Sequence, residues 1–154
     1  MSDYLSTFAI SASGMNLERL RLEVAATNLA NAHTTRGLDG QPFRPLRVIA
    51  RALGAGADDR FGRIFGAEKA SDDVLKGVGA IDVVPTTGTP RLESDPGNPT
   101  ADARGFVALP QVNPVEETVT ILAAVRAYEA NVRAFGASKT MALKALEIGA
   151  GRNG

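Results

Sequence analysis

The residues that could carry chemistry in this sequence are few and scattered. His33 is the single histidine, and its imidazole could act as a general base or bind a metal ion. Its neighbours Asn31, Ala32, Thr34 and Thr35 supply no second metal ligand. We therefore interpret His33 as a residue at a helix end, in preference to a hydrolase that would use it with a nearby carboxylate.

Two acidic pairs could attract a hard cation. They are Asp58 with Asp59 and Asp72 with Asp73. Neither pair has the regularly spaced oxygen ligands and the glycine of a calcium-binding loop. Solvated loop charge is the favoured interpretation, and we predict no metal site.

Two short segments resemble nucleotide-binding motifs only in part. Gly54–Gly56 lacks the third glycine and the following helix of a dinucleotide fingerprint. The segment Ser138–Thr140 has Ser and Arg133 where a phosphate-binding loop needs glycines. We therefore predict no cofactor and no catalytic residue.

A local excess of positive charge lies in the middle of the chain, at Arg44, Arg47, Arg51, Arg60 and Arg63. Such a cluster is more often a solvated face than an interface, although a partner-binding patch is the alternative. No ladder of aromatic residues accompanies it, which argues against single-stranded nucleic acid as a ligand.

The composition excludes several functional classes. Lysine plus arginine equals aspartate plus glutamate at 17 each, so no net field draws the chain to nucleic acid or to an anionic membrane. Only 5% of the residues are aromatic, and a core of small aliphatic side chains favours closely spaced helices over a bulky-walled substrate pocket. The chain has no cysteine and therefore no disulfide. We also expect no cleaved leader and no transmembrane segment.

A long helix is expected from Tyr4 to about Ala32, because apolar residues recur there at alternating three- and four-residue intervals. Gly14 lowers the helix propensity by about 1 kcal/mol, but its missing side chain would let a neighbouring helix approach closely. The helix should end before Gly37. Its apolar stripe, interrupted at Arg19, consists of Leu5, Phe8, Ala12, Met15, Leu22, Ala26 and Leu29.

A second long helix has the clearest start signal in the sequence. Asn113 can cap it, the fixed φ of Pro114 suits its first turn, and Glu116 and Glu117 complement the positive end of its dipole. Gly149 is a natural stop. Its apolar stripe, interrupted at Lys139, consists of Ile121, Val125, Tyr128, Val132, Phe135, Ala142 and Leu146.

The segment between the helices has a different texture. Glycine and proline become frequent, and β-type runs appear at Phe43–Ile49, Val78–Val84 and Phe106–Leu109. Residues 52–73 are rich in Gly, Ala and Asp, and we expect a mobile loop there. The predicted fold is α+β. Long terminal helices (1–36 and 113–154) pack as a coiled-coil-like pair, with a small, loop-rich β insert (37–112) between them.

The two helices carry more apolar surface than they can hide from each other. The residues off the two stripes are Ile10, Leu17, Leu20, Val24, Val119, Leu122, Met141, Leu143 and Ile148. Large exposed apolar patches usually mark interaction surfaces. We therefore favour burial between subunits over a closed antiparallel helix pair within one monomer.

Two stretches of the sequence resemble a known family. Residues 10–35 read ISASGMNLERLRLEVAATNLANAHTT and resemble the amino-terminal signature of flagellar rod and hook proteins. Residues 94–149 read SDPGNPTADARGFVALPQVNPVEETVTILAAVRAYEANVRAFGASKTMALKALEIG and resemble the carboxyl-terminal part of flagellar basal-body rod proteins. The Thr-x-Gly-aromatic ending of the family is here Thr35-Arg36-Gly37-Leu38. The segment from Gly37 to Leu92 carries little of the family pattern.

This resemblance implies a structural subunit of the proximal flagellar rod. It implies export by the flagellar type III apparatus without a cleaved signal, and polymerisation in the periplasm through the terminal helices, to transmit torque to the hook and filament. The implied partners are copies of the chain, other rod proteins, the rod base on the MS-ring side and, as a further candidate, the LP-ring bushing; no cofactor is implied. The implied assembly residues are Asn28, Leu29, Ala30, Asn31, Asn113, Pro114, Val115, Glu116, Tyr128, Glu129, Ala130 and Asn131.

Two alternative functions stay open from the sequence. One is another flagellar axial subunit of the rod or hook, and the other is a helical adaptor whose apolar stripe receives one partner. Helices gain most of their stability in water from packing an apolar face, so we expect the ends of a free rod subunit to be partly disordered and to fold on assembly.

Overall fold

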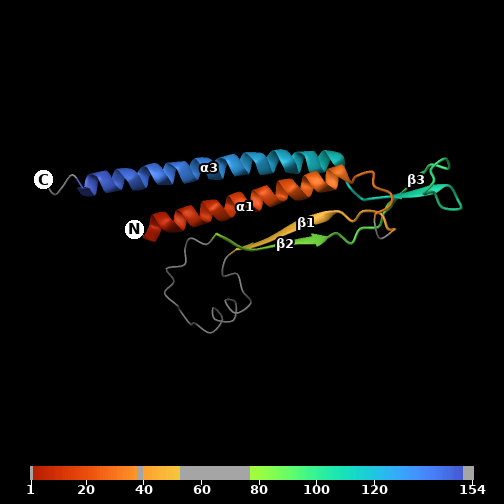
Figure 1. The fold of residues 1–154 in the computed structure, drawn as a ribbon, viewed down its shortest axis with the longest axis horizontal. Coiled ribbons are helices and arrows are strands. Elements are labelled where there is room, and N and C mark those ends of the chain that lie inside the picture. Colours follow the sequence, from red (N-terminus) through yellow and green to blue (C-terminus); the bar gives the residue numbers. More distant parts are fainter. Residues whose placement is uncertain (1, 38–39, 53–76, 151–154) are drawn as a thin grey trace, which may run out of the picture. The chain divides into compact units, whose positions relative to one another are not determined.

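The protein is built from two long helices at its ends and short strands between them. The computed structural model describes residues 2–37, 40–52 and 77–150. In chain order the elements are α1 (Ser2–Ala30), β1 (Leu46–Ala52), β2 (Val78–Pro85), β3 (Arg91–Ser94), β4 (Phe106–Leu109) and α3 (Pro114–Ala150) (Figure 1). This architecture confirms the α+β prediction.

The predicted helices are both present, and their ends differ from the predicted ends by one or two residues. Asn113 caps α3 as expected, because its side-chain Oδ1 accepts a hydrogen bond from the N–H of Val115 at 3.1 Å. Glu116 and Glu117 lie in the first turn. No helix within the described ranges is long and apolar enough to cross a membrane.

The strand predictions are confirmed in part. The strands expected at Val78–Val84 and Phe106–Leu109 are β2 and β4, but the strand expected at Phe43–Ile49 begins only at Leu46. Pro45 explains this shift, because proline has no N–H to donate to a sheet. Apart from Ala52, which ends β1, the predicted mobile loop 52–73 lies outside the described residues.

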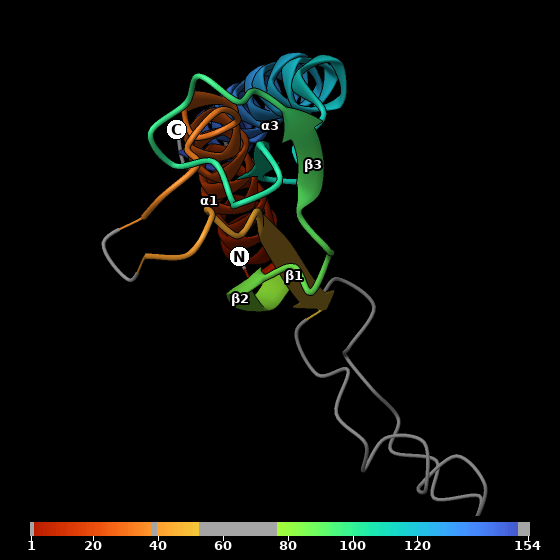
Figure 2. The ribbon, with the colours of Figure 1, turned by 90° about the vertical axis from the view of Figure 1, so that its right-hand side faces the viewer.

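β3 is a strand that the sequence pattern missed. All four of its residues are exposed, so it lacks the apolar alternation of a half-buried strand. It forms through antiparallel pairing with β4, with Arg91 opposite Leu109 and Ser94 opposite Phe106. Figure 2 shows that the structure has two separate sheets, β1 with β2 and β3 with β4, of two strands each. Such small sheets depend on packing for their stability.

The contacts within the chain divide it into two compact units, each of which takes part of both helices. The first unit comprises the described residues of Met1–Arg19, Ala50–Ile81 and Arg126–Gly154. The second comprises those of Leu20–Ile49 and Asp82–Val125.

In the first unit, α1 and α3 pack in opposite directions. The rings of Phe8 and Phe135 lie with their centroids 4.8 Å apart, and Gly14 faces Asn131. A Cβ added to Gly14 would lie 3.0 Å from the amide nitrogen and oxygen of Asn131. The close helix approach that the sequence suggested at Gly14 is therefore confirmed.

In the second unit, small and aliphatic side chains form the core. Ala25 of α1 and Ala124 of α3 are each only 1% exposed, and Val24 is also buried. Val107 and Leu109 of β4 complete this core, since their side chains are on the buried face of the sheet.

The faces that the helices bury carry small or polar residues at seven-residue spacing. Ser11, Glu18 and Ala25 are buried on α1, and Ala124 and Ser138 are buried on α3. The heptad spacing of a coiled-coil-like pair is thus present, but the larger apolar stripes lie to one side of it. No large side chain among the described residues is fully buried.

Candidate functional site

The residues that could carry chemistry do not converge in the structure. His33 lies exposed in the turn after α1, whereas Ser138 is buried within α3 next to an exposed Lys139. The acidic pairs at 58–59 and 72–73 and the glycines at 54 and 56 lie outside the described residues. Within the described ranges, no three His, Cys, Asp or Glu side chains are grouped so that they could hold a metal ion.

The basic cluster is described only in part. Arg44, Arg47 and Arg51 are exposed before and along β1, and none of them forms an ion pair with another described residue. Arg60 and Arg63 lie outside the described residues. A role of this cluster as an interface stays a prediction.

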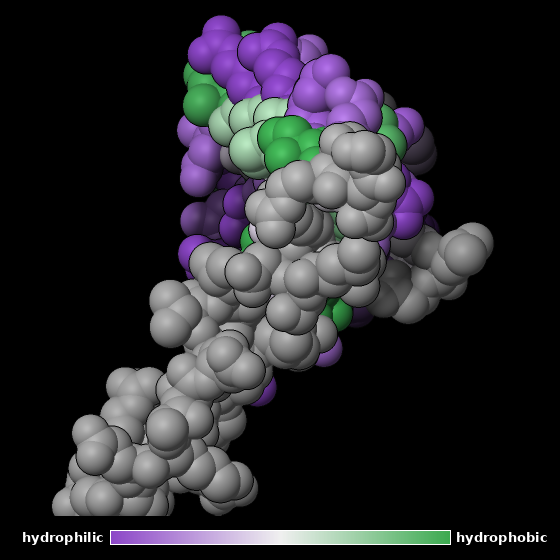
Figure 3. All heavy atoms as spheres, turned by 90° about the vertical axis from the view of Figure 1, so that its left-hand side faces the viewer, coloured by the Kyte–Doolittle hydropathy of each residue, from purple (hydrophilic) through white to green (hydrophobic). Residues whose placement is uncertain are grey.

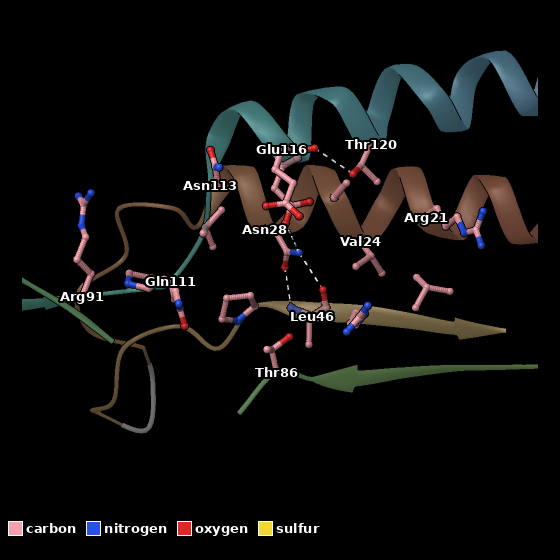
Figure 4. A pocket seen from close by; sticks show the side chains of 17 residues that line it. Arg21, Val24, Asn28, Leu46, Thr86, Arg91, Gln111, Asn113, Glu116 and Thr120 are labelled. Atoms are coloured by element: carbon pink, nitrogen blue, oxygen red, sulfur yellow. Dashed lines mark hydrogen bonds between the residues drawn. The ribbon is translucent and has the colours of Figure 1, made fainter. Parts of the chain in front are cut away.

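Asn28 joins α1 to β1 and α3 through three hydrogen bonds (Figure 4). Its Nδ2 donates to the carbonyl oxygen of Leu46 at 2.9 Å and to Oε1 of Glu117 at 3.0 Å. Its Oδ1 accepts the N–H of Leu46 at 2.8 Å. The residue is 2% exposed, and its amide pairs with Leu46 as a backbone peptide group on a neighbouring strand would. Asn28 is therefore a buried positioning residue.

A groove of about 670 Å³ adjoins Asn28 in the second unit. Its lining combines aliphatic residues with charged residues of both signs. The charged residues are Arg21, Arg47, Arg91, Glu116 and Glu117. The lining contains no histidine that could serve as a base. This mixed surface suits contact with a protein better than the largely apolar enclosure of a small-molecule site.

The residues of the two family-like signatures have several different roles. Asn31 donates from its side chain to the carbonyl oxygen of Thr27 at 2.9 Å, and Leu29 beside it is half-buried. Glu129 faces Arg133 at 3.5 Å on the surface of α3. The signature residues that are exposed are Ala30, Asn113, Pro114, Val115, Glu116, Tyr128, Glu129 and Ala130.

The outer surface of α3 carries most of the exposed large apolar side chains of the described residues. They are Val115, Val119, Leu122, Val125, Tyr128, Val132, Met141, Leu143, Leu146 and Ile148. Ile148 is 74% exposed and Val115 is 71% exposed. Figure 3 views the side at which α1 begins and α3 ends, where apolar side chains interrupt the hydrophilic surface.

The stripe residues predicted from the sequence are divided between two environments. Phe8, Met15, Leu22 and Leu29 on α1 are half-buried, as are Ile121 and Phe135 on α3. The exposed stripe residues are Val125, Tyr128, Val132 and Leu146. Leu5 belongs to α1, but its side chain lies outside the described set. On α1, none of the described large apolar side chains is exposed.

Sequence reasoning missed the contact that ties α1 to β2. The hydroxyl of Ser13 donates to the carbonyl oxygen of Ile10 at 2.8 Å and accepts the N–H of Val78 at 3.1 Å. Gly77 makes room for it, because an added Cβ there would collide with the Ser13 hydroxyl. A serine inside a helix gives no signal of its distant partner.

Asp102 organises the turn between β3 and β4. Hydrogen bonds from the backbone N–H groups of Phe106 and Arg104 to its carboxylate lower the pKa of Asp102. The ionised carboxylate therefore stabilises the turn above the pKa that Asp102 has in the unfolded chain, and this contribution is lost as the pH falls through the lowered value.

We expect this turn to loosen in acid. In an NMR titration of the full chain, the Asp102 carboxyl should titrate below the usual range for aspartate, with the amide of Phe106 shifting in step. The variant Asp102→Asn should abolish that step while the rest of the spectrum keeps its pH dependence. A Phe106 amide that does not respond to pH in the native chain would contradict this prediction.

The chain is similar to flagellar rod proteins over nearly its whole length. The family described as "Flagella basal body rod protein" matches residues 8–36, and the one described as "Flagellar basal body rod FlgEFG protein C-terminal" matches residues 103–148.

Curated relatives with the name flagellar basal-body rod protein FlgC match across the insert as well. The relative from Escherichia coli O6:H1 is 37% identical over 145 residues, which cover 94% of this chain and 97% of the relative. The relative from Bacillus subtilis strain 168 is 36% identical over 145 residues, covering 91% and 94%. The relative from Aquifex aeolicus is 38% identical over 141 residues, covering 90% and 92%.

Proposed function

We propose a mode of assembly for this chain, which belongs to the FlgC family of flagellar basal-body rod proteins and is a structural subunit of the bacterial flagellar rod. The proposal is that its terminal helices hold it in a helical polymer with other rod subunits. The exposed apolar residues of α3 would form the main contact. No catalytic step is part of this function.

The exposure of α3 is the observation that carries the proposal. Ten large apolar side chains lie exposed along this helix, although water disfavours such a surface. Burying even about 1,000 Å² of apolar area per subunit would contribute about 25 kcal/mol before the costs of ordering and association. That is ample for a durable joint between subunits.

The geometry of assembly follows from the use of two different surfaces. A contact between unlike surfaces, whose rotation does not close a ring, builds a helical tube. Helices packed along the axis of such a tube would make it stiff enough to transmit torque from the motor to the hook and filament. We propose that the free chain orders its helix ends only when neighbours cover their apolar faces.

We propose the following setting for this assembly. The chain would be exported by the flagellar type III system without a cleaved signal and would join the proximal rod in the periplasm. Its neighbours would be copies of the chain, other rod proteins and the rod base on the MS-ring side. The exposed arginines along β1 are candidates for contact with the LP-ring bushing.

Val132→Asp tests the proposed assembly. Val132 is 45% exposed, so the change should leave the stability of the chain within about 0.5 kcal/mol of the native value. A buried, unpaired carboxylate in the rod contact should nevertheless prevent rod formation and swimming. Secretion of the subunit, measured by immunoblot of cell fractions, should stay intact. Leu22→Asp should also block assembly, but Leu22 is half-buried and its change would weaken folding as well.

Ala137→Asp is the matched control for Val132→Asp. It adds the same charge at another exposed position of α3, away from the apolar stripe. Isolated basal bodies with this variant should contain complete rods. Normal swimming of cells with Val132→Asp would count against assembly through α3.

A further inference from the structure

We propose, resting on the function proposed above, that the outer stripe of α3 docks against the outer face of α1 in a second copy of this chain. The outer stripe of α3 is defined here as Val115, Thr118, Leu122, Val125, Glu129, Val132, Gly136, Lys139, Leu143 and Leu146. All ten residues are exposed, and they recur at alternating three- and four-residue spacing. That spacing forms a continuous seam on a helix.

The outer face of α1 offers a surface of complementary shape. It is defined here as Ala9, Ala12, Asn16, Arg19, Glu23, Ala26 and Ala30, which follow the same three-and-four spacing. These residues are exposed except for Ala12, which is half-buried, and four of the seven are alanine. The bulky side chains of α3 can therefore fit between small side chains of α1, with the two helices in close approach.

Charge selects one register for this contact. Lys139 is a charged residue within the outer stripe of α3, and it forms no ion pair with any described residue. With the helices antiparallel, Lys139 can face Glu23 of the second copy. Gly136 then faces Ala26, and Val132 faces Ala30. A shift by one heptad would place Lys139 opposite Asn16 or Ala30, where no carboxylate could pair with it.

The same register brings the remaining large residues of the stripe into contact. Leu143 would lie along the methylene groups of Arg19, which can cover apolar surface while the guanidinium stays in water. Leu146 would lie beside Asn16. Glu129 would lie just beyond Ala30, near the turn that follows α1.

A pairing of α3 with α3 in the second copy is the competing arrangement. An antiparallel pair centred near residue 134 would also join Glu129 to Lys139. That contact, however, uses the same surface twice and closes into a dimer, so it cannot extend into a rod. The contact between α3 and α1 uses two different surfaces and leaves one of each free on the pair. It can therefore repeat without limit.

The register also predicts how far neighbouring copies are displaced. Within one chain, Asn131 faces Gly14. In the proposed contact, the part of α1 that faces Asn131 comes from around Asn31 of the second copy. The second copy would thus be displaced by about 17 residues along the helix, or roughly 26 Å at 1.5 Å per residue.

Cysteine cross-linking in isolated basal bodies tests the contact, because the native chain has no cysteine. The double variant Ala30→Cys with Val132→Cys should form a ladder of dimers and larger products on mild oxidation. Each single variant should stay monomeric. The pair Val132→Cys with Gly136→Cys reports on the α3–α3 arrangement, and dimers from that pair without a ladder from the first would overturn the proposal.

A charge exchange tests the register without oxidation. Lys139→Glu should reduce the number of complete rods by about tenfold, and adding Glu23→Lys to it should restore them to within about twofold. Lys144→Glu is the control, because Lys144 lies off the outer stripe and pairs with Glu147 at 2.7 Å in its own chain. It should leave the number of rods unchanged.

The outcomes separate this inference from the proposed function. If Lys139→Glu lowers the number of rods and Glu23→Lys fails to restore them, the register is wrong. If rods form and cells swim but the Ala30→Cys with Val132→Cys variant gives no ladder, the α1 face is not the partner, while the rod function stands. If the cysteine variant forms no rods, the charge exchange decides alone.

Discussion

Asn28→Asp is expected to lower the free energy of unfolding of the full chain by about 3 kcal/mol at pH 7. The substitution keeps an oxygen that can accept the N–H of Leu46, but it removes both donated hydrogen bonds. The new carboxylate would face the carbonyl oxygen of Leu46 and the side chain of Glu117 at a site that is 2% exposed. Urea denaturation of the full chain measures this loss.

The cost of Asn28→Asp should depend on pH. Burial and the neighbouring oxygens raise the pKa of the introduced carboxyl in the folded state above its unfolded value. The variant is therefore least destabilised below the unfolded pKa, and the loss grows as the pH rises through the folded pKa. Asn28→Leu removes the same donors without adding a charge, so its cost should not vary with pH. Equal costs for both variants at every pH would contradict the electrostatic part of this explanation.

Asn16→Asp is the matched control for Asn28→Asp. Asn16 lies exposed on the same helix, so the identical chemical change should alter the stability by about 0.5 kcal/mol or less. A large loss in this variant would show that α1 tolerates no added negative charge, whatever its position.

Gly14→Leu is expected to cost about 2–3 kcal/mol of unfolding free energy by forcing α1 and α3 apart. A Cβ at Gly14 alone would already approach Cγ of Asn131 to 3.1 Å, and the rest of the leucine side chain has no space. The contact between Phe8 and Phe135 lies in the same unit and should weaken too. A reduced near-ultraviolet signal and a lower urea midpoint would report the separation.

A second glycine provides the opposite expectation. Gly136 lies in α3 with nothing within 4 Å of an added Cβ. Gly136→Ala should therefore stabilise the free chain by about 0.5–1 kcal/mol through its better helix propensity. If Gly14→Leu and Gly136→Ala changed the stability in the same direction, the close approach at Gly14 could not be the cause.

The sequence was sufficient to predict the elements that local signals specify. The cap at Asn113 with Pro114 sets the start of α3 within a residue, because capping depends on neighbouring atoms alone. β4 has a buried alternating face and was predicted at its observed bounds, whereas the exposed β3 was missed. β3 exists because its backbone pairs with β4, and that pairing leaves no trace in its side chains.

The buried faces of the helices were harder to predict. Periodicity drew attention to large residues such as Val132, which in the structure is exposed, while Ala124 at the same heptad spacing is buried. A large residue can be reserved for a neighbouring molecule, and a single sequence does not say which contacts are intramolecular. Asn28 was named through the family resemblance, but its three partners lie 18 and 89 residues away along the chain.

The peptide-like pairing of Asn28 with Leu46 has a consequence for coexistence with many identical chains. An open strand edge can recruit a strand from another molecule and start amyloid-like growth. Here a side chain of α1 already occupies the hydrogen-bonding groups of Leu46, and Ser13 does the same for the N–H of Val78. The amino-terminal helix thus shields both strands from strand exchange, so crowded subunits can meet through helices without fusing their sheets.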